Sequence, residues 1–497
     1  MRCIGLDLGT TKICGVAIDT DPPPGRVLGV VSREHNAGLP GAETWEHLQD
    51  PGRILAAARE ALGELCAPAG TAASRLDGLC LTGQMHGVLY ADERGQAVSP
   101  LMSWLDNRAG RPHPSGGSWA DALSAAVGRR IASGYGAATH YYNRHHGLVP
   151  PQAAYLCTIM DYVTLQLTAG PAGVPRRPAT DATIAASVGL ADPLSGRSDP
   201  RALEAAGLER VLPSETLDAG SRVGSTAGGQ GVPSGVPVFA PLGDNQAGFL
   251  GAVRDVEGMA LLNIGTGGQI SAWLPAGRAE GKAAVSASGR AEGSAGRPSV
   301  GLEVRPFPGG GVLLVGATLC AGKAYAVLEG FFRAVLEAFG ERTEGALYER
   351  MNELAAAQGA LAGEGLRVDT RFNGTRQDPW IHGAIQGITL RNLTPAALVR
   401  GFLEGIAGEL RDHFAALVRL RGAPVRGLAA SGNGLRLNPV LRQEAARRFG
   451  MPLLVPRLRE EAALGAALAA AVGLGRYPGF RAAGQIIDYE GEEVGHG

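Results

Sequence analysis

The sequence predicts an α/β protein built from two similar halves, and three observations lead to this expectation. Near the start, two apolar runs enclose the turn Gly9-Thr10-Thr11, which is the pattern of a β-hairpin. In the middle of the chain the same pattern returns around Gly265-Thr266-Gly267. A buried-strand pattern that ends at a glycine occurs at 78–83 and again at 427–432. Because the patterns recur in the same order, they indicate an internal duplication.

Helices are expected between these strands. Residues 54–66, 396–421 and 440–449 carry apolar side chains at helical spacing. The segment 281–298 is rich in Gly, Ala and Ser, which predicts a mobile loop, most simply a tolerated insertion. With the boundary between the halves near Gly251, we expect an N-terminal lobe over 1–250 and a C-terminal lobe over 251–490.

Composition narrows the class of protein. Among 497 residues, 46 are Lys or Arg and 47 are Asp or Glu, so the basic excess typical of nucleic-acid binders is absent. The sequence contains no apolar run long enough for a membrane span. Its six cysteines are scattered without a CxxC pair, and the N-terminus has no signal-peptide pattern. A cytoplasmic globular protein is therefore expected. Lysine occurs only at Lys12, Lys282 and Lys323, which we attribute to genomic base composition.

The two Gly-Thr turns are candidate phosphate-binding loops. Glycine allows the backbone to approach a ligand closely, and successive N–H groups and hydroxyls can then point at one anion. A turn in each half could hold a polyphosphate from both sides, although ordinary hairpins use such turns as well. Asp7, just before the first turn, is suited to Mg²⁺ with retained waters, or alternatively to stabilising the hairpin.

A second acidic residue follows an apolar strand. Asp244 lies in the segment Gly243-Asp244-Asn245 after residues 236–240. At the floor of a cleft it could accept the proton of an attacking hydroxyl. An aspartate between small residues also serves as an ordinary turn residue, so only its combination with the other motifs favours catalysis.

Two segments in the first half combine polar and aromatic groups that suit a polyhydroxylated ligand. The first contains Gln84, Met85 and His86, and the second contains Trp104 and Asp106. Taken singly, His86 would be a structural histidine and Trp104 a core residue. The His- and Tyr-rich stretch 140–146 lacks the accompanying carboxylates that would favour a metal site.

Taken together, these segments resemble the FGGY family of carbohydrate kinases over essentially the whole chain. The family's C-terminal pattern is also similar to 374–379, 383–388 and 404–406, and its adenosine loop to 431–438. The resemblance implies an α/β fold of two actin-like (ribonuclease H-like) lobes. Each lobe would have a mixed sheet flanked by helices, with a central catalytic cleft between them.

The resemblance also implies roles for individual residues. Asp244 would be the catalytic base and Asp7 would sit at Mg²⁺. Lys12 stands where the family often has serine; it either contacts phosphate or faces solvent. Residues expected at ATP are Thr10, Thr11, Lys12, Gly265, Thr266, Gly322, Gly432, Asn433 and Asn438. Those expected to line the sugar pocket are Gln84, Met85, His86, Trp104, Asp106 and Asn245.

Within the family, residues 83–87 resemble ketose kinases of the xylulokinase and sedoheptulokinase kind, and residues 133–139, 158–163 and 180–187 are closer to the latter. The expected activity is ATP-dependent phosphorylation of the terminal primary hydroxyl of a ketose, with sedoheptulose first and D-xylulose or another pentulose as the alternative. Two non-enzymatic alternatives are an actin- or Hsp70-like nucleotide switch and a silent sugar sensor. The expected partners are sugar and ATP, without nucleic acid or membrane; such kinases are commonly homodimers.

Overall fold

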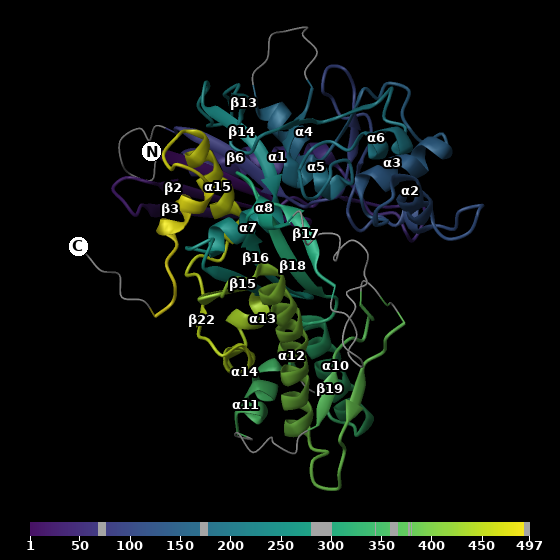
Figure 1. The fold of residues 1–497 in the computed structure, drawn as a ribbon, viewed down its shortest axis with the longest axis vertical. Helices are drawn as coiled ribbons and strands as arrows, with labels where there is room; N and C mark the ends of the chain where they lie inside the picture. Colours follow the sequence, from purple (N-terminus) through teal and green to yellow (C-terminus); the bar gives the residue numbers. More distant parts are fainter. Residues whose placement is uncertain are drawn as a thin grey trace.

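A computed structural model describes residues 1–67, 76–168, 177–279, 301–342, 344–357, 366–375, 378 and 380–491. The chain forms two lobes, each built around a mixed β-sheet with helices packed against it. Figure 1 shows the lobe of the N-terminal half at the top and that of the C-terminal half below it. The predicted loop 281–298 lies outside the described residues.

The sheet of the first lobe has the strand order β13-β14-β6-β1-β2-β3. β1 pairs antiparallel with β2 and parallel with β6, so the hairpin predicted around Gly9 is formed. The central strands β1, β2 and β6 are buried on both faces, because helices such as α1 (Pro51–Cys66) cover the sheet, whereas the edge strand β3 is mostly exposed. The strand bounds are β1 Arg2–Leu8, β2 Lys12–Asp19, β3 Arg26–Glu34, β6 Gly78–Gly83, β13 Arg222–Ser225 and β14 Pro237–Gly243.

The sheet of the second lobe repeats this arrangement. Its order is β17-β18-β16-β15-β21-β22, in which β15 pairs antiparallel with β16 and parallel with β21. Reading from β22 to β18 reproduces the order from β14 to β3 in the first lobe, which confirms the predicted duplication. The strand bounds are β15 Met259–Ile264, β16 Gly268–Leu274, β17 Glu303–Pro306, β18 Val312–Thr318, β21 Gly427–Ser431 and β22 Leu453–Leu454.

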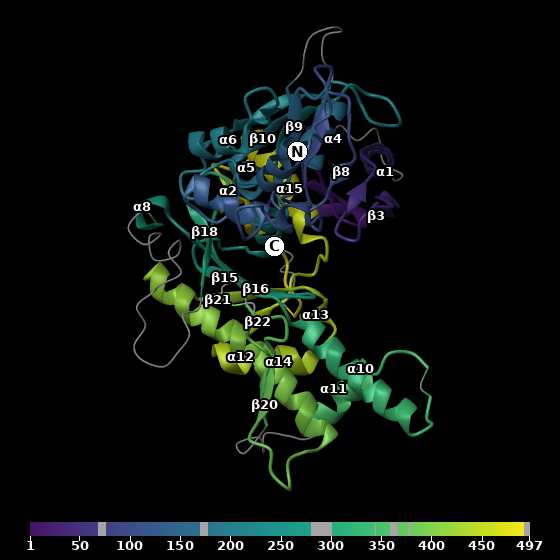
Figure 2. The same ribbon diagram turned by 90° about the vertical axis from the view of Figure 1, so that its right-hand side faces the viewer.

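The predicted helices are present with nearly the predicted bounds. α1, α12 (Pro395–Arg421) and α14 (Pro439–Phe449) each begin with proline after a capping side chain. Figure 2 shows α12 running along the C-terminal lobe. The other helices of this lobe are α8 Ala276–Ala279, α10 Gly322–Ala338, α11 Tyr348–Ala357 and α13 Asn433–Arg436, and β19 Arg367–Asp369 pairs with β20 Ala384–Gln386.

An insertion between β6 and β13 carries part of the predicted sugar site. Its helices are α2 Trp119–Val127, α3 Gly136–His145, α4 Ile159–Leu167, α5 Ala182–Val188 and α6 Pro200–Ala206. Short strands of the first lobe form small additional sheets, namely β4 Gly38–Leu39, β5 Leu48–Gln49, β7 Leu89–Ala91, β8 Leu101–Met102, β9 Tyr155–Cys157, β10 Ala179–Asp181, β11 Leu212–Pro213 and β12 Glu215–Leu217.

Two helices join the lobes. α7 (Asp244–Ala252) follows β14, and α15 (Glu461–Gly473), although close to the C-terminus, returns to the first lobe (Figure 1). A Cβ atom on Gly251 or Gly465 would collide with the backbone of the opposite helix, so glycine permits their close packing. Residues of both halves share the core around these helices. The lobes are therefore joined by a packed apolar interface.

Candidate active site

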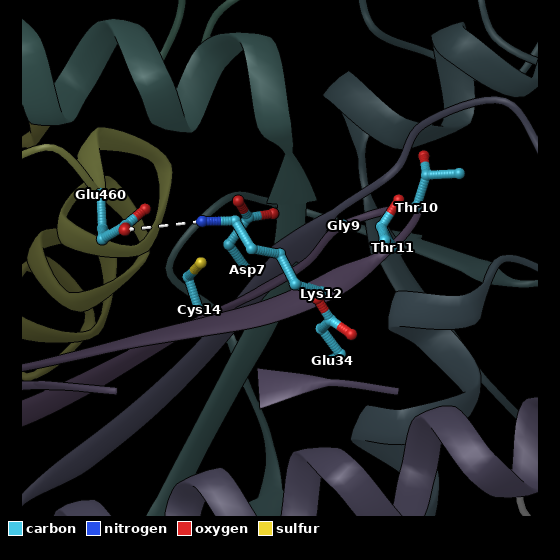
Figure 3. Close-up of a pocket in the computed structure, with 8 residues that line it drawn as sticks. All are labelled: Asp7, Gly9, Thr10, Thr11, Lys12, Cys14, Glu34 and Glu460. Carbon is cyan, nitrogen blue, oxygen red and sulfur yellow. Dashed lines mark ion pairs between the residues drawn. The ribbon is translucent and has the colours of Figure 1, made fainter. Parts of the chain in front are cut away.

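A cavity of about 360 Å³ opens at the first Gly-Thr turn. Figure 3 shows that its walls come from β1, β2, the end of β3 and the start of α15. Residues predicted separately for metal and phosphate binding thus share one cavity. The lining residues are Asp7, Gly9, Thr10, Thr11, Lys12, Cys14, Glu34 and Glu460.

Asp7 is one of the three acidic residues of this cavity and is partly buried near the end of β1. Burial raises the pKa of Asp7 to about 7, with further increases from the negative charges of Asp244 and Glu460. The Lys12 ammonium opposes this effect. Three carboxylates line the cavity and Lys12 is the cation among its lining residues, so the excess of negative charge favours binding of a further cation.

Lys12 begins β2 and extends across the cavity. Its Nζ lies 3.7 Å from a carboxylate oxygen of Glu460, the residue immediately before α15. Figure 3 shows the Lys12 amino group beside Asp7 and directed toward Glu460. The side chain is about half exposed, at 52%, so a phosphate group entering the cavity could compete for it. Lys12 therefore lines the cavity, and its contact with phosphate stays a prediction.

The first Gly-Thr turn is held by hydrogen bonds from three neighbouring segments. The Trp104 indole N–H donates to the Thr10 hydroxyl at 3.0 Å, and Gln49 Nε2 donates to the Thr10 carbonyl at 2.7 Å. Gln84 Nε2 donates in turn to Gln49 Oε1 at 2.7 Å. His35 Nε2 lies 3.2 Å from the Gly9 carbonyl oxygen. Residues predicted for the sugar site therefore position the predicted phosphate turn.

Asp244 is the first residue of α7, directly after β14. Because β14, β6 and β1 are adjacent and parallel, the ends of β14 and β1 bring Asp244 and Asp7 to the same edge of the sheet. Burial raises the pKa of Asp244 to about 6, against the lowering effect of the Arg305 guanidinium. A carboxyl group with this pKa is largely ionised at neutral pH and can accept a proton.

The backbone that precedes Asp244 is fixed by buried polar groups. The Gly243 N–H donates to the Thr183 hydroxyl at 2.8 Å, and Thr183 donates to the buried Asp181 carboxylate. The side chain of Met85 packs against Gly243, where a Cβ atom would collide with it. These contacts therefore restrict the backbone immediately before Asp244.

His86 adopts a backbone conformation that is rare for residues other than glycine, with φ at +78°. Its ring stacks on Tyr135, with centroids 4.6 Å apart and an interplanar angle of 7°. Nδ1 lies 2.7 Å from the Ser187 carbonyl oxygen. Unusual backbone conformations of this kind cluster at ligand sites, and the contacts fix the orientation of the ring.

Two predicted sugar-pocket amides have carbonyl oxygens without a hydrogen-bond partner among the described residues, Gln84 Oε1 and Asn245 Oδ1. Both oxygens are buried, and their amide nitrogens donate elsewhere, that of Asn245 to Gln269 Oε1 at 2.9 Å. Unpaired acceptors are uncommon in protein interiors, so each marks a place where another hydroxyl or water completes the hydrogen bonding.

Asp106 and Trp104 differ in how available they are to a ligand. Asp106 is only 1% exposed, and both of its carboxylate oxygens accept hydrogen bonds from the Arg108 guanidinium, at 2.7 and 3.0 Å. In this arrangement the Asp106 carboxylate fixes the conformation of its own segment through Arg108. Its contact with a sugar stays a prediction. Trp104, in contrast, is 46% exposed beside the first turn, so it is not a core residue.

The second Gly-Thr turn packs on the start of α10. The Gly322 N–H donates to the Gly265 carbonyl at 3.0 Å, and the Lys323 N–H donates to the Thr266 carbonyl at 2.9 Å. A Cβ atom on Gly322 would collide with the Gly265 carbonyl oxygen, so glycine is required for this contact. Gly265 and Thr266 themselves are exposed. The turn is therefore exposed to solvent, while its backbone is fixed by the start of α10.

The predicted adenosine loop divides into two parts. Gly432 has φ at +85° and approaches the Ile264 carbonyl, so the loop lies beside the second turn, and Asn433 begins α13. Asn438 is 5% exposed, and its Oδ1 accepts the Leu441 N–H at 2.9 Å as the N-cap of α14. This side chain therefore has a structural function, and its contact with a nucleotide stays a prediction.

Sequence reasoning missed several contributors to this region. Glu460 carried no motif, and only the return of α15 to the first lobe places it opposite Lys12. Arg305 was equally inconspicuous but influences Asp244 from β17. The alternation of residues along β2 could have identified Cys14, which lies on the same face as Lys12.

Two findings concern features outside the cavity. In the described residues, no group of three His, Cys, Asp or Glu side chains is arranged to hold a metal ion by itself. No helix in the described part of the chain is long and apolar enough to cross a bilayer.

Two duplicated lobes, a Gly-Thr turn in each, and two carboxylates at one sheet edge define an actin-like phosphotransferase. The chain belongs to the FGGY family of carbohydrate kinases, whose members are ATP-dependent. The family's N-terminal domain matches residues 2–251 and its C-terminal domain matches residues 298–474. The protein is thus an ATP-dependent carbohydrate kinase, and the nucleotide-switch and sugar-sensor alternatives are set aside.

Similar proteins act on different polyols. The chain is 28% identical over 501 residues to a sedoheptulokinase of Homo sapiens, with 94% of this chain and 96% of the relative covered. It is 26% identical over 493 residues to a glycerol kinase of Aromatoleum aromaticum, with 96% of this chain and 91% of that relative covered. The xylulose kinase structure from Rhodospirillum rubrum superposes with a TM-score of 0.79 at 24% identity. The superposition covers 99% of this chain and 94% of that structure's chain.

Proposed function

We propose that this kinase transfers the γ-phosphoryl group of ATP to the terminal primary hydroxyl of a ketose, with sedoheptulose as the preferred substrate. The observation that carries the proposal is the meeting of Asp244 and Asp7 at one edge of the first sheet. One carboxylate is needed beside the hydroxyl that reacts, and a second beside the charged phosphates. The adjacent strands β14 and β1 supply them.

Asp244 acts as the general base. Its carboxylate orients the substrate hydroxyl and accepts its proton as the oxygen forms a bond to the γ-phosphorus. The bond between this phosphorus and the β–γ bridging oxygen breaks, and ADP leaves with that oxygen. Asp244 stands at the first turn of α7, directly after Gly243, against which Met85 packs. This position suits the role because base catalysis requires a fixed geometry.

Asp7 is the residue that would hold Mg²⁺. It fits this role because it is partly buried among other carboxylates whose charges raise its pKa, and a divalent cation relieves that repulsion. When bound, Mg²⁺ neutralises charge on the phosphates. The phosphates themselves are held by the Gly-Thr turns of the two lobes, by Thr10, Thr11 and Lys12 in the first lobe and by Gly265 and Thr266 in the second. Gly322, Gly432 and Asn433 lie beside the nucleotide.

The ketose is held by the wall formed by Gln84, His86 and Asn245. The unpaired oxygens of Gln84 and Asn245 are acceptors for sugar hydroxyls, and the fixed His86 ring supplies a further polar group. A seven-carbon ketose is favoured over shorter polyols by the likeness to sedoheptulokinase, in which 94% of this chain is covered. The likenesses to xylulose and glycerol kinases make D-xylulose and glycerol the competing substrates.

Measurement of ADP release with a substrate panel tests the proposal. The panel contains sedoheptulose, D-xylulose, D-ribulose, L-ribulose, glycerol and an aldose, each compared by kcat/KM. We expect sedoheptulose to give the highest value, and the product should carry phosphate on its terminal carbon. A clear preference for D-xylulose would show that the substrate is a pentulose and not sedoheptulose. A preference for glycerol or an aldose would refute the ketose assignment.

A further inference from the structure

The positions of the few lysines are unusual. Only three of the 46 basic residues of the chain are lysine, so arginine is the ordinary cation of this protein. The two lysines that the structure describes each adjoin one of the two Gly-Thr turns. Lys12 lines the cavity at the first turn, and Lys323 is hydrogen-bonded through its backbone to the second. The composition explains why lysines are few, but it does not explain where they are.

Lys323 is held rigidly against the second turn at the level of the backbone. The Lys323 N–H donates to the Thr266 carbonyl at 2.9 Å, and the Ala321 N–H donates to the same oxygen at 3.1 Å. The preceding Gly322 bonds to Gly265 and tolerates no Cβ atom. The Cα of Lys323 therefore keeps a fixed place beside Thr266.

From this position the ammonium can reach a ligand of the turn. A lysine side chain extends on the order of 6 Å from Cα to Nζ, and its flexible stem sweeps a wide volume. Burial raises the pKa of the neighbouring Cys320 thiol, and the Lys323 ammonium acts to lower it. Cys320 follows β18, whose last residue Thr318 borders Gly267. The positive charge of Lys323 therefore acts on a residue that lies next to the second turn.

Among the residues that the structure describes, the side chain of Lys323 has no hydrogen-bond or ion-pair partner. Lys323 is exposed, and no carboxylate of the described residues forms an ion pair with it. In contrast, Lys12 already pairs with Glu460. A free cation next to an outward-facing Gly-Thr turn matches an anionic ligand. Lysine suits a phosphate oxygen because its ammonium is a compact point charge that approaches from many directions.

We propose that Lys323 binds the phosphate groups of the nucleotide from the C-terminal lobe, as the counterpart of Lys12 in the N-terminal lobe. The inference rests on the proposed nucleotide site and adds a residue to it. One cation from each lobe then contacts a single polyphosphate, so nucleotide binding ties the lobes together. The ligand class is a nucleoside di- or triphosphate, since the uncharged nucleoside offers nothing to either ammonium.

The test is a binding measurement that requires no turnover. Isothermal titration calorimetry compares ADP with adenosine for the wild type, Lys323→Gln, Lys323→Arg and Lys12→Gln. We expect Lys323→Gln to weaken ADP binding about tenfold or more, because a charge-assisted hydrogen bond is lost. Adenosine affinity should not change, and Lys323→Arg should keep most of the ADP affinity. The dependence of ADP affinity on salt should also become shallower in Lys323→Gln.

The matched control is Arg350→Gln, which removes an exposed positive charge on α11 of the same lobe. It should bind ADP as the wild type does, and thermal unfolding verifies that every variant is folded. Wild-type affinity for ADP in a folded Lys323→Gln would overturn the inference, as would an equal loss for ADP and adenosine. If the wild type bound ADP but phosphorylated no sugar, the proposed function would fail while the role of Lys323 could still be judged.

Discussion

The indole N–H of Trp104 donates a 3.0 Å hydrogen bond to the hydroxyl of Thr10. Trp104 belongs to the segment predicted to contact the sugar, and Thr10 belongs to the turn predicted to contact phosphate. The two predicted subsites are therefore mechanically connected, together with the Gln84–Gln49 pair that bonds to the same turn. Movement of one wall of the sugar site is expected to displace the phosphate turn.

This connection predicts the effect of Trp104→Phe, which keeps an aromatic ring but removes the N–H donor. A neutral hydrogen bond of this kind contributes about 1 kcal/mol. We expect KM for ATP to rise about two- to tenfold at saturating sugar, measured by ADP release. Trp380→Phe is the control, since Trp380 is 83% exposed and distant in sequence from the turn. An unchanged KM for ATP in Trp104→Phe would show that the bond does not position the turn.

Substitution of Asp244 should separate catalysis from nucleotide binding. Asp244→Asn retains the shape of the side chain but cannot accept the proton, so kcat should fall about 10²–10⁴-fold. The affinity for ADP, measured by calorimetry, should stay close to that of the wild type. The exposed Asp218→Asn serves as the control and should retain full turnover. Near-normal kcat in Asp244→Asn would remove this residue from the role of base.

The ionisation of Asp244 predicts an acid limb in the pH dependence of the reaction. Burial raises the pKa of Asp244 to about 6, and only the ionised carboxylate can take up the substrate proton. The value of kcat/KM for the sugar should therefore be constant above pH 7 and decrease tenfold per pH unit well below pH 6. Initial rates between pH 5 and 8 would measure this. A flat profile over that range would contradict the assignment.

A second buried acid should affect stability in the opposite pH range. Burial raises the pKa of Glu409, on α12, to about 7, although the Thr318 hydroxyl acts to lower it. The protonated form is favoured in the folded state, so its stabilising contribution is full below about pH 4.5 and is lost as pH rises through 7. Glu409→Gln should therefore exceed the wild type in free energy of unfolding at pH 8, by about 3 kcal/mol, since each pKa unit corresponds to about 1.4 kcal/mol.

At pH 5 the difference between Glu409→Gln and the wild type should be much smaller, about 1 kcal/mol, because the folded-state carboxyl is still protonated there. Urea unfolding at both pH values measures the two free energies. Glu353→Gln removes an exposed carboxylate from the same lobe and should show no such pH-dependent difference. If Glu409→Gln were less stable than the wild type at pH 8, the ionised carboxylate would be stabilising, and the buried-acid interpretation would be wrong.

Much of the fold could be predicted because its signals are local. The hairpin turns, the strands ending at Gly83 and near Gly432, and helices such as α12 follow from apolar periodicity and turn residues within short windows. The duplication could be recognised for the same reason, since each half repeats those windows in the same order. The motif residues Asp7 and Asp244 were likewise identified from their positions at the ends of strand patterns.

The long-range contacts of the site could not be predicted in this way. Glu460 opposes Lys12 only because α15 leaves the C-terminal half and packs beside β1. Only the structure shows that Asp106 accepts hydrogen bonds from Arg108 and that Asn438 caps α14, because both partners are recognised only once the chain is folded. Each motif names a chemical group, but the hydrogen bonds around that group decide whether it remains available to a ligand.

The amino-acid sequence alone determined which residue types stand at the turns and strand ends, because backbone preference and hydrophobic alternation act between near neighbours in the chain. Only the tertiary structure decided which of those residues meet. Packing of α7 against α15 and the parallel order of β14, β6 and β1 bring distant segments to one sheet edge. Burial and neighbouring charge at that edge then set the ionisation of Asp7 and Asp244, since both depend on distances that no short segment encodes.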